Sequence, residues 1–388
     1  MQLVAMGAQD VYLTGNPQIT FFKVVYRRHT NFSKECIAQQ FNGTADFGSS
    51  VTCTLARNGD LVQEIYLRAK VGLAVNAQAL VDTKGYILED LTSLINTVEV
   101  EIGGQKIDKH YSQWLDIYND LFETSHDYRN VMNKVSGTAD TTAKEHTVYI
   151  PLRFWFNRNP GLALPLIALQ YHEVKVNITL NGKNKIFANF DTAGNGTVSA
   201  ALPASFAHLT LESADLLVNY LYLDTDERRR FAQVSHEYLI EQVQHTGPES
   251  EANIDMTFNH PVKALFWSGS NWNNVKLQLN GHDRAAEQAH DYYHLVQPYE
   301  SGLGHSGKQM NGTRGWDTVT GGRGATSTVG MYSFCLKPAE HQPSGTCNFS
   351  RIDNARLSVG TAGQLYLFAM NYNVLRIMSG MGGLAYSN

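Results

Sequence analysis

The sequence predicts an all-β protein made of two similar β sandwiches in tandem, and three observations support this fold class. Apolar and polar residues alternate along many short segments, helical spacing is scarce, and two kinds of segment recur at a nearly constant distance. The 388 residues are enough for two or three domains that each bury a core. A hydrophobic content of 43% is typical of a globular chain rather than a disordered one.

Alternation at period two is clearest in four segments, which we predict to be strands with one face on a core. These segments are residues 98–102, 174–180, 276–279 and 364–369. Turn-forming pairs such as Gly103–Gly104 and Asn280–Gly281 separate the strands from their neighbours. Strands with one apolar and one polar face are typical of antiparallel sandwiches.

Helical spacing is confined to a few short segments. One amphipathic helix is predicted because five residues recur at i, i+3, i+4, i+7 and i+8; they are Trp114, Ile117, Tyr118, Leu121 and Phe122. Leu88, Leu91 and Ile95 indicate a second, shorter helix. Residues 224–233 begin with the cap-like Asp224 and predict a third helix.

A faint internal repeat favours a duplicated β domain. Residues 98–104 (VEVEIGG) are echoed by residues 275–281 (VKLQLNG), at an offset of 177 residues. Phe156 and Pro160 are matched by Phe334 and Pro338, at an offset of 178 residues. The seam between the halves is predicted near residues 224–233, which gives each half a normal size for one sandwich.

The charge of the chain argues against nucleic-acid binding. The formal net charge is -5, with 31 Lys and Arg against 36 Asp and Glu, so no cationic excess is available to hold phosphates. The densest basic runs, residues 26–29 and 228–230, are expected to be solvated or interface charges. Charged residues make up only 17% of the chain, which favours surfaces that pack against neighbours.

Cysteine usage and the chain start indicate a soluble protein made in the cytosol. The four cysteines, Cys36, Cys53, Cys335 and Cys347, form no C-x-x-C pair and are expected to be buried thiols. Residues 1–6 lack the features of a signal peptide. The longest apolar run, residues 161–169, contains Pro165 and is shorter than the roughly 20 residues that a membrane-spanning helix needs.

Several long segments resemble the major capsid proteins of nucleocytoplasmic large DNA viruses, closest to the phycodnavirus and chlorella-virus branch. The longest are residues 7–22 (GAQDVYLTGNPQITFF), 26–32 (YRRHTNF), 160–174 (PGLALPLIALQYHEV) and 371–383 (NYNVLRIMSGMGG). Shorter matches cover residues 57–60, 102–108, and 231–233 with 236–238. Together they follow the family's order along essentially the whole chain, and such long matches are far more specific than a short motif.

The resemblance implies two tandem eight-stranded antiparallel jelly rolls, with short decorating helices in the loops. It also implies a homotrimeric, pseudo-hexameric capsomer that forms the icosahedral outer shell of a large double-stranded DNA virus. The implied partners are further copies of the chain, neighbouring capsomers, minor capsid proteins and the internal virion membrane, without direct nucleic-acid binding. The implied location is the virion, after synthesis and assembly in the host cytoplasm.

The expected domains are an arm over residues 1–25, a first jelly roll over 26–223, a linker helix over 224–235 and a second jelly roll over 236–388. The stretch 267–331 is shorter than in many family members, where long outer loops lie. The chain is therefore either the principal shell protein or a related paralogue used at particular positions.

The N-terminal arm combines two opposing features. Gly7, Gly15, Asn16 and Pro17 disfavour a central strand, since proline cannot donate a ladder hydrogen bond. The apolar residues of the same stretch, Val11, Tyr12, Leu13, Ile19, Phe21 and Phe22, are too many to stay in water. We therefore expect the arm to pack beneath the sandwiches or onto neighbouring shell proteins.

A glycine-rich motif invites a nucleotide-binding hypothesis. Residues 302–307 spell G-x-G-x-x-G, and Lys308 extends the motif towards a phosphate loop. However, Gln309 occupies the position where a hydroxyl would hold magnesium, Pro298 interrupts the approach, and Asn311–Gly312 breaks any following helix. We predict an exposed loop with no nucleotide.

Histidines suggest a metal site, but without a recognisable motif. The best cluster is His282, Asp283, His290, Asp291 and His294, and no H-E-x-x-H occurs. There is also no G-x-S-x-G elbow and no cysteine in a nucleophile setting. We therefore predict that the chain is not an enzyme and has no catalytic, cofactor-binding or metal-binding residues.

The alternative function is a jelly-roll protein that binds or cleaves carbohydrate. Paired carboxylates can be distant in a sequence, and Trp267, Trp272 and Trp316 could stack on sugars. Packing in a core or loop is the expected role of these tryptophans.

The chain contains six glycosylation sequons, which we expect to be unmodified without a secretory signal. They begin at Asn31, Asn42, Asn177, Asn195, Asn311 and Asn348. The family resemblance also implies that glycans can be attached on outer loops regardless of the usual sequon.

Overall fold

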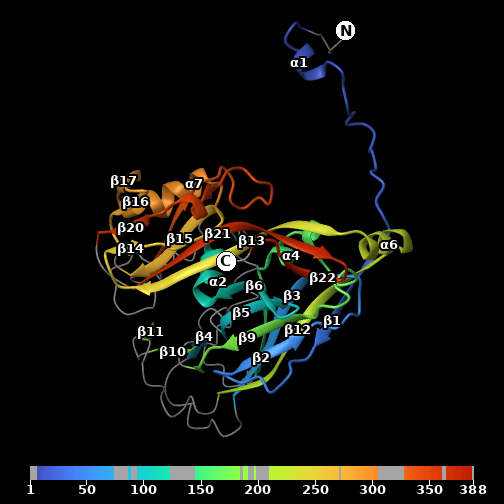
Figure 1. Ribbon diagram of the computed structural model, residues 1–388, viewed down its shortest axis with the longest axis horizontal. Coiled ribbons are helices and arrows are strands. Elements are labelled where there is room, and N and C mark those ends of the chain that lie inside the picture. The colour runs from blue at the N-terminus through green and yellow to red at the C-terminus, as the bar shows by residue number, and fades with distance from the viewer. Residues whose placement is uncertain are drawn as a thin grey trace.

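The fold consists of two antiparallel β sandwiches, seen side by side in Figure 1. The computed structural model describes residues 7–73, 86–88, 94–122, 145–183, 187–190, 196–197, 209–270, 272–304, 327–360 and 364–386. Within these ranges, no helix is long and apolar enough to cross a membrane.

The first sandwich is a jelly roll. One sheet has the order β1-β12-β3-β7, with β8 also paired to β3, and the facing sheet has the order β2-β9-β5-β6. If its eight main strands are counted along the chain, the sheets run 1-8-3-6 and 2-7-4-5, which is jelly-roll order. The bounds are β1 Phe32–Gln39, β2 Ser50–Thr54, β3 Leu61–Leu73, β5 Ile95–Ile102, β6 Gln105–Tyr111, β7 Glu145–Pro151, β8 Leu164–Pro165, β9 Val174–Leu180 and β12 Leu209–Leu223. A small extra sheet contains β4 Tyr86–Leu88, β10 Phe187–Phe190 and β11 Gly196–Thr197.

The second sandwich repeats the same strand order. Its sheets are β13-β21-β15-β18 and β14-β20-β16-β17, which again run 1-8-3-6 and 2-7-4-5. The bounds are β13 His236–Glu249, β14 Asn253–Asp255, β15 Pro261–Ser270, β16 Val275–Leu279, β17 His282–Gln288, β18 Ser327–Ser333, β20 Ala355–Val359 and β21 Leu365–Met378. Two short strands, β19 Cys347–Asn348 and β22 Met381–Leu384, pair with β15 and β21. The predicted all-β class and double jelly roll are confirmed.

The internal repeat of the sequence marks equivalent places in the two rolls. Residues 98–104 end β5, and residues 275–281 contain β16; each is the fourth main strand of its roll, followed by the hairpin to the fifth. Phe156 and Phe334 both follow the sixth main strand, β7 and β18 respectively. The offset therefore reports a real structural duplication.

Alternation along the strands builds the two main cores. In β9 the four apolar side chains are buried and the residues between them are partly exposed, as the period-two pattern predicts. One core lies between the sheets of the first roll and another between those of the second. In β21 the residues between the core positions are buried as well, so the expectation of one face on a core is incomplete there.

The helices of the described residues are short, and apart from α1 in the arm they lie in connections between strands. The predicted amphipathic helix is α2, Ser112–Leu121, and the helix predicted over residues 224–233 is α6, Thr225–Gln233. The helix suggested by Leu88, Leu91 and Ile95 is wrong, because Leu88 ends β4 and Ile95 begins β5, while Leu91 lies outside the described residues. The remaining helical segments are α1 Val11–Thr14, α4 Trp155–Arg158, η3 Pro160–Leu162, η5 Tyr292–Val296, α7 Gln297–Glu300 and η6 Phe349–Arg351.

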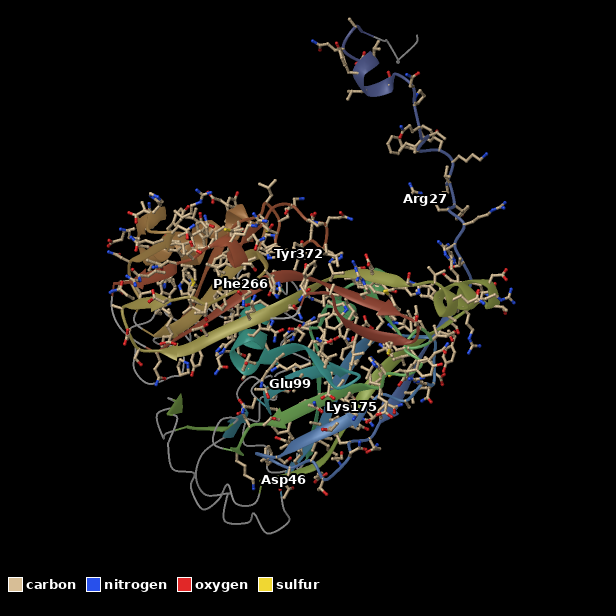
Figure 2. All side chains as sticks on the ribbon, viewed as in Figure 1. Arg27, Asp46, Glu99, Lys175, Phe266 and Tyr372 are labelled. Atoms are coloured by element: carbon tan, nitrogen blue, oxygen red, sulfur yellow. The ribbon has the colours of Figure 1, made fainter. Side chains whose placement is uncertain are left out.

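Residues 7–31 project from one end of the molecule as an arm. Strand pairing begins only at Phe32, which lies opposite Leu223 on β12. Figure 1 shows the arm leaving beside α6, and Figure 2 shows Arg27 on it, away from both rolls. Most of its apolar side chains are exposed.

Candidate functional site

Helix α2 forms an apolar contact between the two rolls. It follows β6 of the first roll directly; Leu115 is buried in the first core, whereas Trp114, Ile117 and Leu121 form a second buried apolar face. This face belongs to one cluster with side chains from the second roll, namely Ala264, Phe266, Val329, Met331, Phe368 and Met370. Trp114 packs edge-on against Phe266, with 5.4 Å between ring centroids. The cluster buries the outer face of the sheet that contains β21 and β15.

The core of the first roll also includes residues of the second roll. Ile240 on β13 and Leu375 and Ile377 on β21 belong to the first core. These strands are long enough to run from the second roll across the end of the first, as Figure 1 shows. The two rolls are therefore joined by shared packing as well as by the chain.

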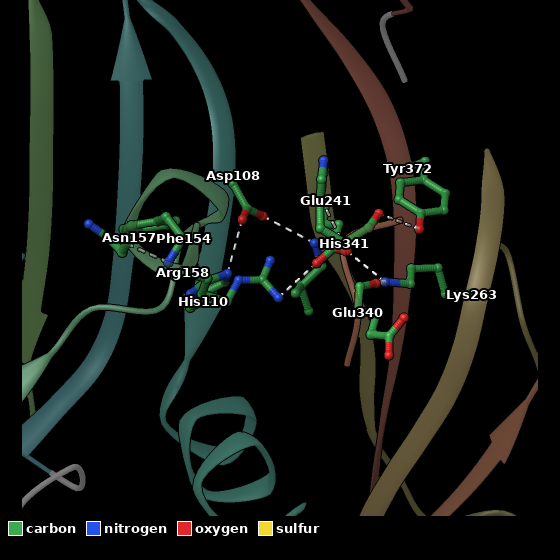
Figure 3. Close-up of polar contacts among 11 residues, drawn as sticks. Asp108, His110, Phe154, Asn157, Arg158, Glu241, Lys263, Glu340, His341 and Tyr372 are labelled. Atoms are coloured by element: carbon green, nitrogen blue, oxygen red, sulfur yellow. Dashed lines mark hydrogen bonds and ion pairs between the residues drawn. The ribbon is translucent and has the colours of Figure 1, made fainter. Parts of the chain in front are cut away.

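A buried charged cluster lies beside this shared packing (Figure 3). Glu241 on β13 accepts a hydrogen bond of 2.6 Å from Lys263 on β15 and forms an ion pair of 2.8 Å with Arg158 at the end of α4. The Lys263 side chain is fully buried, and that of Glu241 is 7% exposed. Because Arg158 comes from the first roll and the other two residues come from the second, the cluster ties the rolls together.

The loop after β18 covers this cluster from the second roll. Lys263 donates to the backbone carbonyl of Glu340 at 3.0 Å, and Tyr372 donates to that of His341 at 3.3 Å. The His341 ring lies 3.9 Å from Glu241, and the Lys263 ammonium lies 5.1 Å from the centre of the Tyr372 ring. Lys263 and Glu241 thus each have an oppositely charged partner, and Lys263 also has a hydrogen-bond acceptor in the loop. Charged groups that are buried in a low dielectric need such partners.

Electrostatics favour the ionised form of Glu241. Burial alone would raise its pKa, but attraction to Arg158, together with hydrogen bonds and attraction from His341 and Lys263, lowers the pKa to about 2. The carboxylate therefore stays charged across the ordinary pH range.

Asp108 and His110 on β6 extend the polar junction towards the first roll. Asp108 accepts a hydrogen bond of 3.1 Å from the backbone N–H of Val243 on β13. Its other oxygen lies 2.9 Å from His110 Nε2 without the alignment of a hydrogen bond. The His110 ring stacks on Phe154 at 4.5 Å. These contacts again connect the first roll to a strand of the second.

The linker between the rolls is anchored through Asp60. This carboxylate accepts a hydrogen bond of 2.9 Å from the backbone N–H of Leu223 and pairs with Arg228 of α6 at 2.9 Å. Arg229 and Arg230 are exposed. The basic run 228–230 is thus partly an anchor and partly solvated charge.

The histidine cluster of the sequence does not gather into a metal site. Asp283 pairs with Lys276, His290 packs on Trp272, and His294 is buried with Nδ1 2.7 Å from the Val329 carbonyl. Within the described ranges, no group of three or more His, Cys, Asp or Glu residues could hold a metal ion. The side chains of this cluster serve packing and surface pairing.

The structure describes part of the glycine-rich motif and some of the tryptophans and sequon residues singled out in the sequence. The glycine-rich motif follows α7 rather than a strand, and residues 305–308 lie outside the described part of the chain. Trp267 and Trp272 are buried in the second core, so they offer no stacking surface for a sugar. Trp316 and the sequon residues Asn195 and Asn311 lie outside the described part.

The cysteines follow the expectation only in part. Cys53 and Cys335 are buried and unpaired, and burial raises the pKa of Cys53 to about 11. Cys347 is half-buried, whereas Cys36 is exposed on the edge strand β1. The expectation of a buried thiol is therefore wrong for Cys36.

Comparison with known proteins identifies the family. Residues 20–224 match the family described as major capsid protein N-terminus, and residues 227–272 and 318–383 match the large eukaryotic DNA virus major capsid protein family. A major capsid protein of Pyramimonas orientalis virus is 50% identical, over 100% of this chain and 99% of that protein. The chain belongs to the major capsid proteins of large eukaryotic DNA viruses.

A further relative supports this membership in sequence, and two solved structures support the fold. The major capsid protein of Paramecium bursaria Chlorella virus 1 is 40% identical, over 100% of this chain and 99% of that protein. A quasi-atomic structure of the PBCV-1 virus capsid superposes with a TM-score of 0.75 and 37% identity, covering 95% of this chain and 100% of that chain. The Faustovirus major capsid protein shares the fold, with a TM-score of 0.65 and 12% identity over 96% of this chain and 94% of that chain.

As a major capsid protein, the chain has a structural role in the viral shell. The functional elements of such a protein are the contacts that fix its shape and join it to its neighbours. The sequence reasoning missed the Arg158–Glu241–Lys263 cluster altogether. One signal was available, because Lys263 stands within the apolar run of β15, where a buried lysine needs a charged partner.

Proposed function

We propose that this major capsid protein works as a homotrimer with a pseudo-hexameric outline, and that these capsomers tile an icosahedral outer shell. The observation that carries the proposal is the pair of rolls with identical strand order, fixed side by side within one chain. Three such chains around a threefold axis would present six similar blocks. A capsomer of this shape can be surrounded by six neighbours, and closed symmetry keeps it finite.

The proposed division of the chain is an arm over residues 1–25, a first roll over 26–223, a linker with α6 over 224–235 and a second roll over 236–388. Strand pairing, which starts at Phe32 and resumes at His236 after α6, supports the two rolls and favours an arm that extends to residue 31. The anchoring of α6 through Asp60 supports a linker held in one position rather than a loose tether.

The proposed partners are further copies of the chain, neighbouring capsomers, minor capsid proteins and the internal virion membrane. The exposed apolar side chains of the arm support a role in contacts beyond the chain itself. The formal net charge of -5 favours no direct contact with nucleic acid. We also infer synthesis and assembly in the host cytoplasm, as the family resemblance implies.

We also propose that the chain has no catalytic activity of its own. Arg158, Glu241 and Lys263 are paired with one another at the junction, and this pairing disfavours a catalytic role for these charged groups. The burial of Trp267 and Trp272 disfavours the alternative of a carbohydrate-binding or carbohydrate-cleaving protein.

Light scattering and native mass spectrometry on protein released gently from virions test the trimer. The expected mass is three times 43.2 kDa. Obligate interfaces usually bury roughly 2,000 Å² or more, so the trimer should survive dilution. A stable monomer at micromolar concentration, with no larger species, would contradict the proposal.

A further inference from the structure

The arm contains a short segment, residues 21–28 (FFKVVYRR), that combines bulky apolar side chains with cations. Phe21 is 90% exposed, Phe22 97% and Tyr26 85%, and Val24 and Val25 are exposed as well. Side chains of this size do not remain in water when a partner surface is available. The segment is therefore built to contact something outside the chain.

The charge of the arm indicates an anionic partner. Lys23, Arg27 and Arg28 carry positive charge, and no Asp or Glu occurs from Val11 to Ser33. This local excess stands out in a chain whose formal net charge is -5. An anionic surface would attract the segment, and the attraction would weaken as salt is added.

The order of the apolar residues favours a lipid surface over a shaped protein groove. Phe21–Phe22 and Val24–Val25–Tyr26 are contiguous and do not alternate with polar residues, and residues 21–28 form neither a helix nor a strand in the structure. A groove that binds an extended segment selects alternate side chains. A bilayer interface accepts aromatic side chains together with flanking Lys and Arg, without such a period.

The end of the molecule from which the arm leaves carries further exposed apolar residues. Phe32 lies opposite Leu223, and β13 begins beyond α6 with His236 opposite Ile377, just before the turn to β22. Tyr171, Met378 and Met381 are exposed at this turn, where Tyr171 donates a backbone hydrogen bond to Gly380. Ten residues of extended chain between Phe22 and Phe32 reach about 35 Å from this end.

We propose that residues 21–28 bind the surface of an anionic phospholipid bilayer, with Phe21, Phe22 and Tyr26 in the interface and the cations against lipid phosphates. This inference rests on the proposed function, because it requires the arm ends of the capsomers to face the membrane. One arm binds weakly, and the several arms of one capsomer add to the affinity through their effective concentration.

Vesicle sedimentation of the full-length capsomer tests the inference. The probes are vesicles of phosphatidylcholine alone and of phosphatidylcholine mixed with phosphatidylserine. We expect binding to the mixed vesicles, loss of that binding at high salt, and little binding to phosphatidylcholine alone. Arg27→Gln with Arg28→Gln should weaken binding at least about twenty-five-fold, because each cation near an anionic surface contributes about five-fold. Phe21→Ser with Phe22→Ser should also abolish sedimentation.

A matched control removes the same charge elsewhere. Arg284 and Arg351 are exposed on the second roll, and Arg284→Gln with Arg351→Gln should leave vesicle binding unchanged. Circular dichroism should be identical for all variants, since the arm lies outside the cores.

Two results would overturn the inference. One is a wild-type trimer that does not sediment with either vesicle. The other is sedimentation that the control pair reduces as much as the arm pair does. Under the first result, protection of the arm by other virion proteins would assign it to a protein contact. Failure of the wild-type chain to form a trimer would instead contradict the proposed function, so the two failures are distinguishable.

Discussion

Lys263 and Glu241 face each other from β15 and β13, on either side of β21, with 2.6 Å between Nζ and Oε1. The strand between them supplies Tyr372, which lies directly opposite Glu241 in the ladder. Arg158 of the first roll binds the other carboxylate oxygen. Two oxygens of one side chain therefore connect a strand of the second roll to a helix of the first.

Replacement of Lys263 by methionine should destabilise the protein strongly. Lys263→Met keeps most of the side-chain volume but removes the ammonium group that pairs with the buried carboxylate of Glu241. Breaking one side of a buried ion pair costs about 3 to 5 kcal/mol of unfolding free energy. Urea denaturation at fixed protein concentration measures the change.

Lys276 provides the matched control for this change. It forms an ion pair of 2.9 Å with Asp283, but both side chains are partly exposed. Lys276→Met should therefore alter the unfolding free energy by less than about 1 kcal/mol. Similar losses in the two variants would show that the buried cluster has no special part in stability.

Glu241 should also make stability depend on pH under acidic conditions. Its pKa is lowered from 4.5 to about 2 in the folded chain. A carboxyl group with a lowered folded pKa contributes fully above its unfolded pKa, and the contribution is lost as the pH falls through the folded value. We expect a loss of about 3 kcal/mol from this group between about pH 5 and pH 2, measured by urea denaturation at stepped pH.

Comparison of two glutamine variants isolates this contribution. Glu241→Gln should unfold with a smaller dependence on pH over the acidic window, because the titrating group is gone. Glu237→Gln removes a carboxylate of an exposed pair with Arg376 and should leave the dependence as in the wild type. An unchanged acid profile in Glu241→Gln would refute the assignment.

Much of the fold could be predicted because its pattern is local. Strands such as β9 show their buried face through strict alternation, and the repeated segments 98–104 and 275–281 mark the duplication. The helix suggested around Leu88 and Ile95 failed because three apolar residues at helical spacing also fit two successive strands. Short apolar runs do not distinguish the two structures without their tertiary partners.

The junction between the rolls could not be predicted, because it depends on contacts distant in sequence. Glu241 is 83 residues from Arg158 and 22 from Lys263, and no motif spacing connects them. Phe368 lies between the second-core residues Leu367 and Ala369 on β21, where alternation alone predicts a solvent-facing side, yet α2 covers it. That covering helix was predicted from sequence, but the surface on which it packs was not.

Trp114 should be the principal apolar contact between the rolls. It is buried against Phe266 and Phe368, with ring centroids 5.4 and 5.7 Å away. Trp114→Ala should lower the unfolding free energy by about 3 to 5 kcal/mol through lost contact and the cavity left behind. Trp114→Phe should recover part of that loss, as thermal and urea denaturation would show.

A surface substitution provides the comparison for Trp114. Leu336 is 76% exposed, so Leu336→Ala should change the unfolding free energy by no more than about 0.5 kcal/mol. Equal effects of Trp114→Ala and Leu336→Ala would mean that the α2 contact contributes nothing to joining the rolls.

No structural metal should be needed for stability. The best histidine cluster of the sequence is dispersed among packing contacts and ion pairs. Elemental analysis of protein purified without chelator should find well below one zinc or calcium ion per chain. A chelator should leave the melting temperature unchanged, and a stoichiometric metal whose removal lowers it would contradict the prediction.

Deletion of residues 2–20 should separate folding from assembly. The described part of this stretch, residues 7–20, joins neither a sheet nor an apolar core. Its side chains Tyr12 and Leu13 are accordingly 92% and 86% exposed. Removing the stretch takes away no buried contact of the described residues, so circular dichroism and melting temperature should stay as in the wild type and the shortened chain should still form a trimer. Shell formation, followed by electron microscopy of assembly reactions, should fall because the arm's apolar contacts are missing.

A length-preserving variant completes this test. Tyr12→Ser with Leu13→Ser removes the two most exposed apolar side chains of α1 and should reduce assembly in the same direction as the deletion. Normal assembly of the substituted chain, with poor assembly of the deleted one, would assign the effect to arm length rather than to apolar contact. Complete loss of folding on deletion would show instead that residues 2–20 belong to a core, and the arm would then have to be redefined from its first strand-paired residue, Phe32.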